Sequence, residues 1–186
     1  MNLNKNRVIN KIKTILSRWG FSKRGLFLNS KGEWYLFSQI LIIMLHLIPP
    51  YPKIENIPVS IITFLIIIGL TISFQGLIIS IQAFKDLGDN LTPLPYPMNV
   101  SNFIKKNSYK NNRHPLYKGL LLISLGICIS SFSLIHLFFL LLLAYILKRK
   151  ALKEEERLKI KFPEYEKYIE EIPAIIKKIK YLDWRS

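Results

Sequence analysis

The chain has 186 residues, half of them hydrophobic, and carries a formal charge of +15. This length suits one domain, and the pairing of apolar composition with strong basicity is typical of a membrane protein whose spans have basic flanks. Nucleic-acid binding is excluded because the basic residues flank apolar runs and form no separate basic face. The single cysteine, Cys128, lies within an apolar run, so an intramolecular disulfide is impossible.

Residues 1–33 form a basic arm, which we place in the cytosol. One helical stripe of apolar residues runs along it, comprising Val8, Ile12, Ile15, Leu16 and Trp19. Lysine and arginine side chains lie between these positions, so the pattern predicts an amphipathic helix. This helix would rest either on an anionic membrane surface or against the rest of the protein.

Residues 34–186 are predicted to form a single membrane domain. Apolar runs cover residues 34–48 and 59–84, and a third covers 119–147 without a formal charge. As one helix, the third run would be about 43 Å long, well beyond a hydrocarbon core of ~30 Å. A serine-rich cluster at residues 130–133 divides this run, which predicts a tight helical hairpin with spans at about 116–131 and 133–147.

The distribution of basic residues also favours four spans. Of the 27 lysines and arginines, eight lie in residues 1–33, one in 49–58, six in 85–118 and twelve from residue 148 onward. With four spans, all the basic segments except Lys53 fall on one side of the membrane, as the positive-inside rule requires. We therefore expect an all-α integral membrane protein, of the bacterial inner-membrane type, with both termini in the cytoplasm.

The segments between and after the spans also have distinct patterns. Four prolines within residues 85–118 predict a loop, and residues 148–161 predict a helical extension of the last span. A short amphipathic helix follows and ends at Pro173. On the second run, a strip of small residues would let another helix approach closely; it comprises Gly69, Ser73, Gly76 and Ser80. Mid-span His46 and His136 are expected to pack between helices with interhelical hydrogen bonds.

The first constellation that could carry chemistry is Arg-His-Pro-Leu-Tyr-Lys-Gly at 113–119. Pro115 suits the first position of a helix, which leaves His114 as the cap. The free amides at the helix start, together with Arg113, would make a receptor for a carboxylate or phosphate. Alternatively, Arg113 and Lys118 are ordinary basic flanks of a span.

The second constellation is Glu154, Glu155 and Glu156, directly after the last span. These residues either form ion pairs on the helix face or recognise a cation or a pair of hydroxyls. The predicted hairpin brings them next to Arg113 and His114. A pocket with an anion receptor on one wall and carboxylates on the other suits a zwitterion such as S-adenosylmethionine.

Together, these residues resemble the isoprenylcysteine carboxyl methyltransferase family and the related phospholipid methyltransferases. The resemblance rests on Arg-His-Pro-x-Tyr-x-Gly at 113–119 and on Glu-Glu-x-x-Leu-x-x-x-Phe-x-x-Tyr-x-x-Tyr at 154–168. It extends over roughly residues 59–173 and includes the proline-rich stretch at 87–97. The chain departs from many relatives at Asn107-Ser108-Tyr109, where they have Gly-Pro-Tyr, and after Pro173, where a second proline is frequent.

The resemblance implies a helical membrane methyltransferase whose S-adenosylmethionine pocket is closed by the segment after the last span. By position, the implied cofactor-binding residues are Arg113, His114, Pro115, Tyr117, Gly119, Glu154 and Glu155. Arg113 and His114 are also the candidate catalytic residues, and no metal is implied. The acceptor would be a small lipophilic molecule or lipid bearing a carboxylate, amine or phenol. Two alternatives remain at this point: an NADPH-dependent membrane reductase of the sterol-reductase type, and a non-enzymatic membrane protein.

Overall fold

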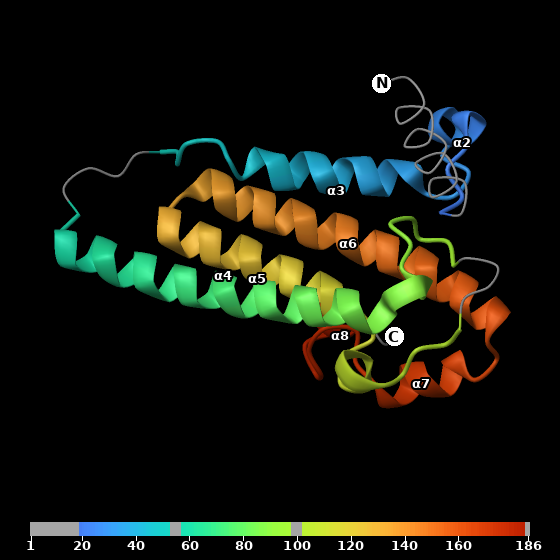
Figure 1. Cartoon of the computed structure of the whole chain (residues 1–186). Helices are drawn as coiled ribbons and strands as arrows, with labels where there is room; N and C mark the ends of the chain where they lie inside the picture. Colours follow the sequence, from blue (N-terminus) through green and yellow to red (C-terminus); the bar gives the residue numbers. More distant parts are fainter. Residues whose placement is uncertain (1–18, 53–56, 98–101, 185–186) are drawn as a thin grey trace, which may run out of the picture.

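The structure, a computed structural model, describes residues 19–52, 57–97 and 102–184 (Figure 1). Helices account for 70% of these residues, and no strand occurs among them, so the all-α prediction is confirmed. The predicted amphipathic helix of the basic arm rests mainly on residues 1–18, which lie outside the described residues.

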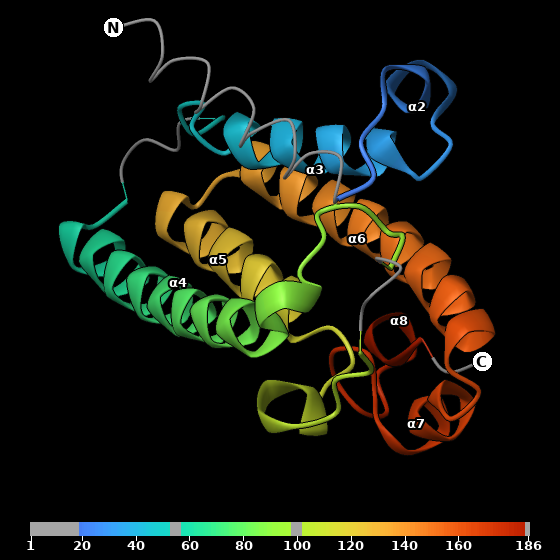
Figure 2. The same ribbon diagram turned by 45° about the vertical axis from the view of Figure 1, so that its right-hand side comes forward.

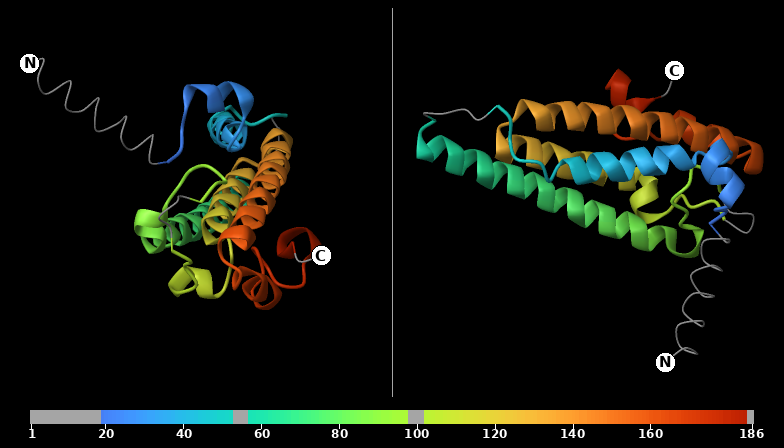
Figure 3. Two further views of the ribbon diagram at one scale, coloured as in Figure 1. Left: turned by 90° about the vertical axis from the view of Figure 1, so that its right-hand side faces the viewer. Right: turned by 90° about the horizontal axis from the view of Figure 1, so that it is seen from above.

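Four long helices run up and down, each antiparallel to the one before it in the chain (Figures 1 and 2). They are α3 (Glu33–Leu45), α4 (Val59–Leu87), α5 (Pro115–Ser131) and α6 (Leu134–Lys161). Helix α5 packs against both α4 and α6, and α3 lies on α6, as the view along the bundle in Figure 3 makes clear.

The short helices gather at one end of the bundle, which we call the polar end (Figure 2). They are α2 (Lys23–Leu28), η1 (Gly88–Asn90), η2 (Asn107–Lys110), α7 (Tyr165–Glu171) and α8 (Lys180–Asp183). Helices α3 and α5 begin at this end, and α4 and α6 finish there. The residues that sequence analysis singled out therefore meet at one end of the molecule.

The helix boundaries follow local signals in the sequence. Helix α5 begins at Pro115 with His114 as its N-cap, as predicted. It ends at Ser131, the following Phe132 has a φ of 42° in the left-handed region, and α6 begins after Ser133. The predicted division at the serine cluster is thus confirmed, and so is the helical extension, because α6 continues to Lys161.

One predicted boundary is wrong. The loop was expected from Lys85, but α4 continues to Leu87. Charged residues do not end a helix when they can remain in its last turn. Here Asp86 stays helical and accepts hydrogen bonds from the side chain of Asn107 and the backbone N–H of Ser108, both at 3.0 Å. These two bonds attach η2 to the end of α4.

Small residues bring α4 and α5 into close contact. A Cβ added to Gly76 would lie 2.7 Å from the carbonyl oxygen of Gly119, and one added to Gly126 would collide with the carbonyl oxygen of Gly69. Ser73 donates to the Ile123 carbonyl at 3.3 Å. The small-residue strip on the second run is therefore a helix-packing surface, as predicted from its spacing.

The face of α4 away from α5 is strongly apolar and exposed. The stretch Val59–Asn90 is the one helix in the described residues that is long and apolar enough to cross a membrane. Only 11% of its most apolar window is buried within the molecule. Of the shorter apolar helices, Pro115–Ser131 packs directly on α4, whereas Glu33–Leu45 packs on α6.

Two histidines join three helices near the end opposite the polar end, and neither lies in the middle of a helix as expected: His46 is the C-cap of α3, and His136 is in the first turn of α6. His46 Nε2 lies 2.6 Å from the Ser124 hydroxyl on α5, and His136 Nε2 lies 3.2 Å from the His46 carbonyl oxygen. Their rings are in edge contact at 5.9 Å. The prediction of packing histidines with interhelical hydrogen bonds is confirmed.

Candidate functional site

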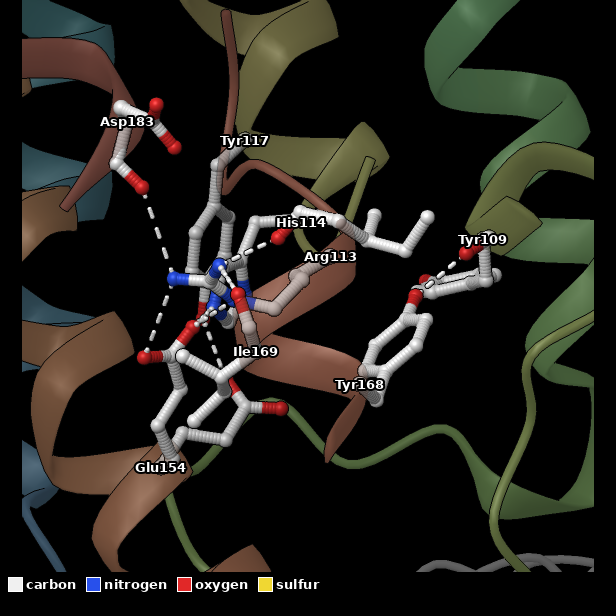
Figure 4. Close-up of polar contacts among 10 residues, drawn as sticks. Tyr109, Arg113, His114, Tyr117, Glu154, Tyr168, Ile169 and Asp183 are labelled. Carbon is white, nitrogen blue, oxygen red and sulfur yellow. Dashed lines mark hydrogen bonds and ion pairs between the residues drawn. The ribbon is translucent and has the colours of Figure 1, made fainter. Parts of the chain in front are cut away.

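Arg113 lies buried at the start of α5, where the protein itself uses all five of its side-chain N–H donors (Figure 4). The Nε atom donates to Glu155 at 2.7 Å, and Nη2 donates to Glu155 at 3.4 Å and to the Asp183 carbonyl at 3.5 Å. The Nη1 atom donates to the carbonyls of Ile169, at 3.3 Å, and Ile172. Arg113 is therefore no open anion receptor, which differs from the expectation drawn from the sequence.

Glu155 is the counterion of this arginine and also binds His114. The His114 Nε2 atom lies 2.7 Å from the same carboxylate oxygen that accepts from Arg113 Nε. Burial raises the pKa of Glu155, but the hydrogen bonds and charges of His114 and Arg113 outweigh burial and hold that pKa below its usual value. The expected arrangement, with Arg113 and the glutamates on opposite walls of a pocket, is thus wrong for Glu155, which contacts Arg113 directly.

The same residues attach the C-terminal segment to the helical bundle. Backbone N–H groups of Arg113 and His114 donate to the carbonyls of Pro173 and Ala174, at 2.9 and 3.1 Å. Ala174 N in turn donates to the Asp183 carbonyl at 3.1 Å. We call this group the buried tie: Arg113, His114, Glu155 and the carbonyls of residues 169–183 that they hold. Its geometry orders the tail against the start of α5.

Glu154 points away from the buried tie. Its Oε2 atom accepts a hydrogen bond from the hydroxyl of buried Tyr117 at 3.0 Å (Figure 4). The Tyr117 ring stacks on the His114 ring with the centroids 5.2 Å apart and the planes 4° from parallel. Glu154 is half-buried, whereas the next residue but one, Glu156, is exposed. The three consecutive glutamates therefore have three different environments.

Two cavities meet at the side chains of Glu154 and His114. The larger cavity has a volume of about 280 Å³. It lies between α3, the end of α4, the proline-rich loop, the start of α5 and the polar part of α6. The smaller, of about 70 Å³, lies between that loop, α6 and α7. Both cavities are lined by a shared set of residues: Leu87, Thr92, Tyr109, Arg113, His114 and Glu154. The volume of the larger cavity lies close to the ~300 Å³ at which ligand sites usually begin.

Aromatic and amide side chains line the smaller cavity. They include Asn90, Asn102, Phe103, Tyr109, Tyr165 and Tyr168. The Phe103 ring contacts the rings of Tyr165 and Tyr168 at 5.4 and 5.2 Å, and the Tyr168 hydroxyl donates to the Tyr109 carbonyl. Burial raises the pKa of Tyr165 and of Tyr168 above the usual value, so both hydroxyls stay protonated donors at neutral pH.

The larger cavity contains a buried lysine that sequence analysis missed. Lys150 is only 4% exposed, and its Nζ donates to the Gln39 side chain at 2.8 Å. Burial lowers the pKa of Lys150 to about 8, although the charge of Glu154 opposes this shift. A signal for it was present, because Lys150 follows the buried Leu147 by three residues and precedes Glu154 by four, which places all three on one helix face.

The expected cofactor-binding residues divide into two groups. Arg113, His114 and Glu154 line both cavities and Tyr117 lines the larger one, whereas the remaining three line neither. These three are Pro115, Gly119 and Glu155. Pro115 starts α5, Gly119 packs against Gly76 and Ser80 of α4, and Glu155 belongs to the buried tie. Within the described residues, no group of three or more His, Cys, Asp or Glu side chains could hold a metal ion.

Comparison with known proteins adds no assignment. No protein-family model matches the chain, and no curated protein is significantly similar to it in sequence.

Proposed function

We propose that the chain is an integral membrane methyltransferase that uses S-adenosylmethionine to methylate a small lipophilic acceptor. The observation that carries this proposal is the pair of cavities that meet at Glu154 and His114. The smaller cavity has polar and aromatic walls whose chemistry suits a nucleoside with a positively charged centre, and at about 70 Å³ it must widen to admit one. The other has mainly apolar walls suited to a lipophilic molecule.

In this proposal, α3, α4, α5 and the apolar part of α6 span the bilayer, with the polar end in the cytoplasm. The antiparallel order of the four helices supports this topology, because it places residues 85–118 and the tail on one side together. The positive-inside rule assigns that side to the cytoplasm. At 13 residues, α3 is about 20 Å long, so the bilayer would thin locally around it.

The cavity linings fit the proposed methyl donor. Some of the residues that would contact it differ from those expected from the sequence. Glu154 carries a carboxylate in both cavities, which suits a sulfonium or ammonium group. Phe103 and the neighbouring tyrosines offer aromatic faces for an adenine ring. Arg113 cannot take the donor's carboxylate while the buried tie holds all its N–H groups. That role falls to Asn90 and Asn102, whose amides line the smaller cavity.

S-adenosylmethionine supplies a methyl group on a positively charged sulfur, which leaves as a neutral thioether when the acceptor's lone pair forms the new bond to carbon. The protein's residues supply position and exclusion of water, and well-aligned reactants can gain ~7–11 kcal/mol from this. His114 is held by Glu155 and stacked on Tyr117, so it orients the wall at which the cavities meet. An acceptor that is already an anion requires no protein base.

The proposal is tested by calorimetric titration of S-adenosylmethionine into the full chain purified in a non-ionic detergent. We expect binding, weakened about tenfold or more in Glu154→Gln because a charge-assisted contact is lost. Glu156→Gln is the matched control, since it removes the same charge two residues away on an exposed surface. It should bind like the unchanged protein.

NADPH, titrated in the same way, discriminates the reductase alternative. Binding of NADPH in place of S-adenosylmethionine would favour a reductase. Absence of binding to either ligand, in protein shown to be folded by circular dichroism, would overturn the methyltransferase proposal. Equal binding by Glu154→Gln and Glu156→Gln would remove Glu154 from the site.

A further inference from the structure

Lys150 is a buried charge with hydrogen-bonding capacity that the described residues do not use. An ammonium has three N–H donors, and here one of them is bonded to Gln39 while the group lies 5.5 Å from the centre of the Tyr117 ring. None of the ion pairs among the described residues involves Lys150. A buried ammonium without a counterion is costly, so this site favours the arrival of an anion.

The nearest carboxylate on the same helix is committed elsewhere. Glu154 lies one turn after Lys150, but its Oε2 atom accepts from Tyr117, and the residue lies in the wall that the two cavities share. Lys150 lines the larger cavity and does not line the smaller one. The larger cavity therefore has a carboxylate at its junction with the smaller one and an ammonium beside Gln39 of α3.

The other walls of the larger cavity are mainly hydrocarbon. Six of the residues that line it are Leu36, Phe84, Leu87, Leu91, Pro93 and Leu116. Arg113 also lines the larger cavity but is paired with Glu155, so Lys150 is the buried cation there without an ion-pair partner among the described residues. Apolar walls around such a cation match a molecule that has a hydrocarbon body and an anionic head. A lipophilic amine would instead bring a second positive charge against Lys150, which like-charge repulsion disfavours.

We propose that Lys150 is the receptor for the head group of a lipophilic carboxylic acid that binds in the larger cavity. The carboxylate accepts the two unused N–H bonds of Lys150, and the hydrocarbon part fills the apolar walls. Identification of this acid as the methyl acceptor rests on the proposed function, whereas its binding does not. On transfer, a carboxylate oxygen lone pair forms the O–CH₃ bond, the S–CH₃ bond breaks toward sulfur, and no proton is released.

The ionisation of Lys150 is compatible with this role. Burial lowers its pKa to about 8, so the group is mostly protonated at pH 7. The side chains that face it are Gln39 from α3, Tyr117 from α5 and Glu154 from its own helix, and of these only Glu154 carries a charge at neutral pH. A bound carboxylate would raise the pKa of Lys150. Binding would therefore be accompanied by uptake of a fraction of a proton by Lys150.

The test uses the full chain in nanodiscs of zwitterionic phosphatidylcholine, with a fluorescent fatty acid as the probe and no S-adenosylmethionine present. Dodecanoate, dodecanol and dodecylamine, which share one chain length, are compared as competitors at pH 7. We expect dodecanoate to displace the probe at a concentration about tenfold or more below that of the other two. Lys150→Met should lose this preference, and the exposed Lys159→Met should keep it.

Equal displacement by the acid and the alcohol, or an unchanged preference in Lys150→Met, would overturn the proposal. Thermal unfolding of each variant shows whether it is folded. The design also separates the two proposals. Acid binding without S-adenosylmethionine binding would contradict the methyltransferase function alone, and the reverse result would contradict the role of Lys150 alone.

Discussion

Glu154 and Glu155 are adjacent in sequence, yet they belong to regions of opposite character. Glu155 lies in the buried tie, where it accepts from Arg113 and His114 and every N–H of the arginine has a protein acceptor. Glu154 lies with Lys150 and Tyr117 in what we call the cavity wall, where charged groups keep bonding capacity for a ligand. A satisfied buried charge stabilises the fold, whereas an unsatisfied one is available for binding.

The largest effect is expected in the buried tie. Glu155→Gln should lower the free energy of unfolding by about 3–5 kcal/mol, because it leaves the Arg113 charge buried without its counterion. The tail should also become more sensitive to protease. Thermal unfolding and limited proteolysis measure both effects, with Glu156→Gln as the exposed control. Equal stability of the two variants would mean that the tie does not hold the tail.

Acid should reveal the same tie. The pKa of Glu155 is lowered from its ordinary value of 4.5, so the unfolded state binds a proton at a higher pH than the folded state does. The stability contributed by this carboxylate is therefore complete above about pH 4.5 and is lost as the pH falls through the folded pKa. Melting temperatures of the unchanged protein should fall more steeply below pH 4.5 than those of Glu155→Gln. Parallel curves would contradict this origin of the lowered pKa.

The cavity wall should change the stability of the protein in alkaline solution, where the buried tie does not. Replacing Lys150 should also have the opposite effect to replacing Glu155, because it removes a buried charge that has no counterion among the described residues. Because the folded pKa of Lys150 is about 8, against 10.5 when unfolded, the unfolded state binds more protons between these values. Stability should therefore rise from pH 8 to 9.5, by up to about 2 kcal/mol relative to Lys150→Met. Thermal unfolding of both proteins across this range measures the difference. If Lys150 had a purely structural role, Lys150→Met would be the less stable protein at pH 7.

The smallest effect should come from loss of the hydrogen bond between Tyr117 and Glu154 in the cavity wall. Tyr117→Phe removes the hydroxyl that donates to Glu154 but keeps the ring that stacks on His114. We expect a loss of about 1 kcal/mol in stability, because Glu154 is half-buried and water can replace the lost donor. Thermal unfolding and the affinity for S-adenosylmethionine measure the two consequences. A loss as large as that of Glu155→Gln would show that the wall is as tightly coupled as the tie.

Much of the fold was predictable from local patterns. Pro115 lacks an N–H that the first turn does not need, so it marks the start of α5, and the serine cluster marks the turn of the hairpin. The spacing of Gly69 and Gly76 indicated the surface that α5 occupies. The end of α4 was not predictable in this way, because Asp86 stays helical only where Asn107 and Ser108 return to bond it.

The candidate site divides in the same manner. Arg113, His114 and Glu154 were identified from motif spacing, since the hairpin necessarily brings the start of α5 next to the end of the apolar part of α6. The separate roles of Glu154 and Glu155 could not be predicted, because neighbouring positions on a helix differ by about 100° in direction and only the packed partners decide which one faces a cavity. The spacing of Lys150 from Leu147 and Glu154 gave a signal for its helix face, but only the packing shows that it is buried.

Apolar length, proline and charge along the chain specify where the helices run, which ends carry the basic residues and which end collects the polar side chains. The hydrogen bonds of the folded chain show what the sequence could not: Arg113 donates all five of its N–H groups to Glu155 and the tail, while Lys150 keeps two N–H groups that the described residues do not use. Hydrogen-bond satisfaction is a property of groups far apart in sequence, and it exists only once the tail has folded back against α5.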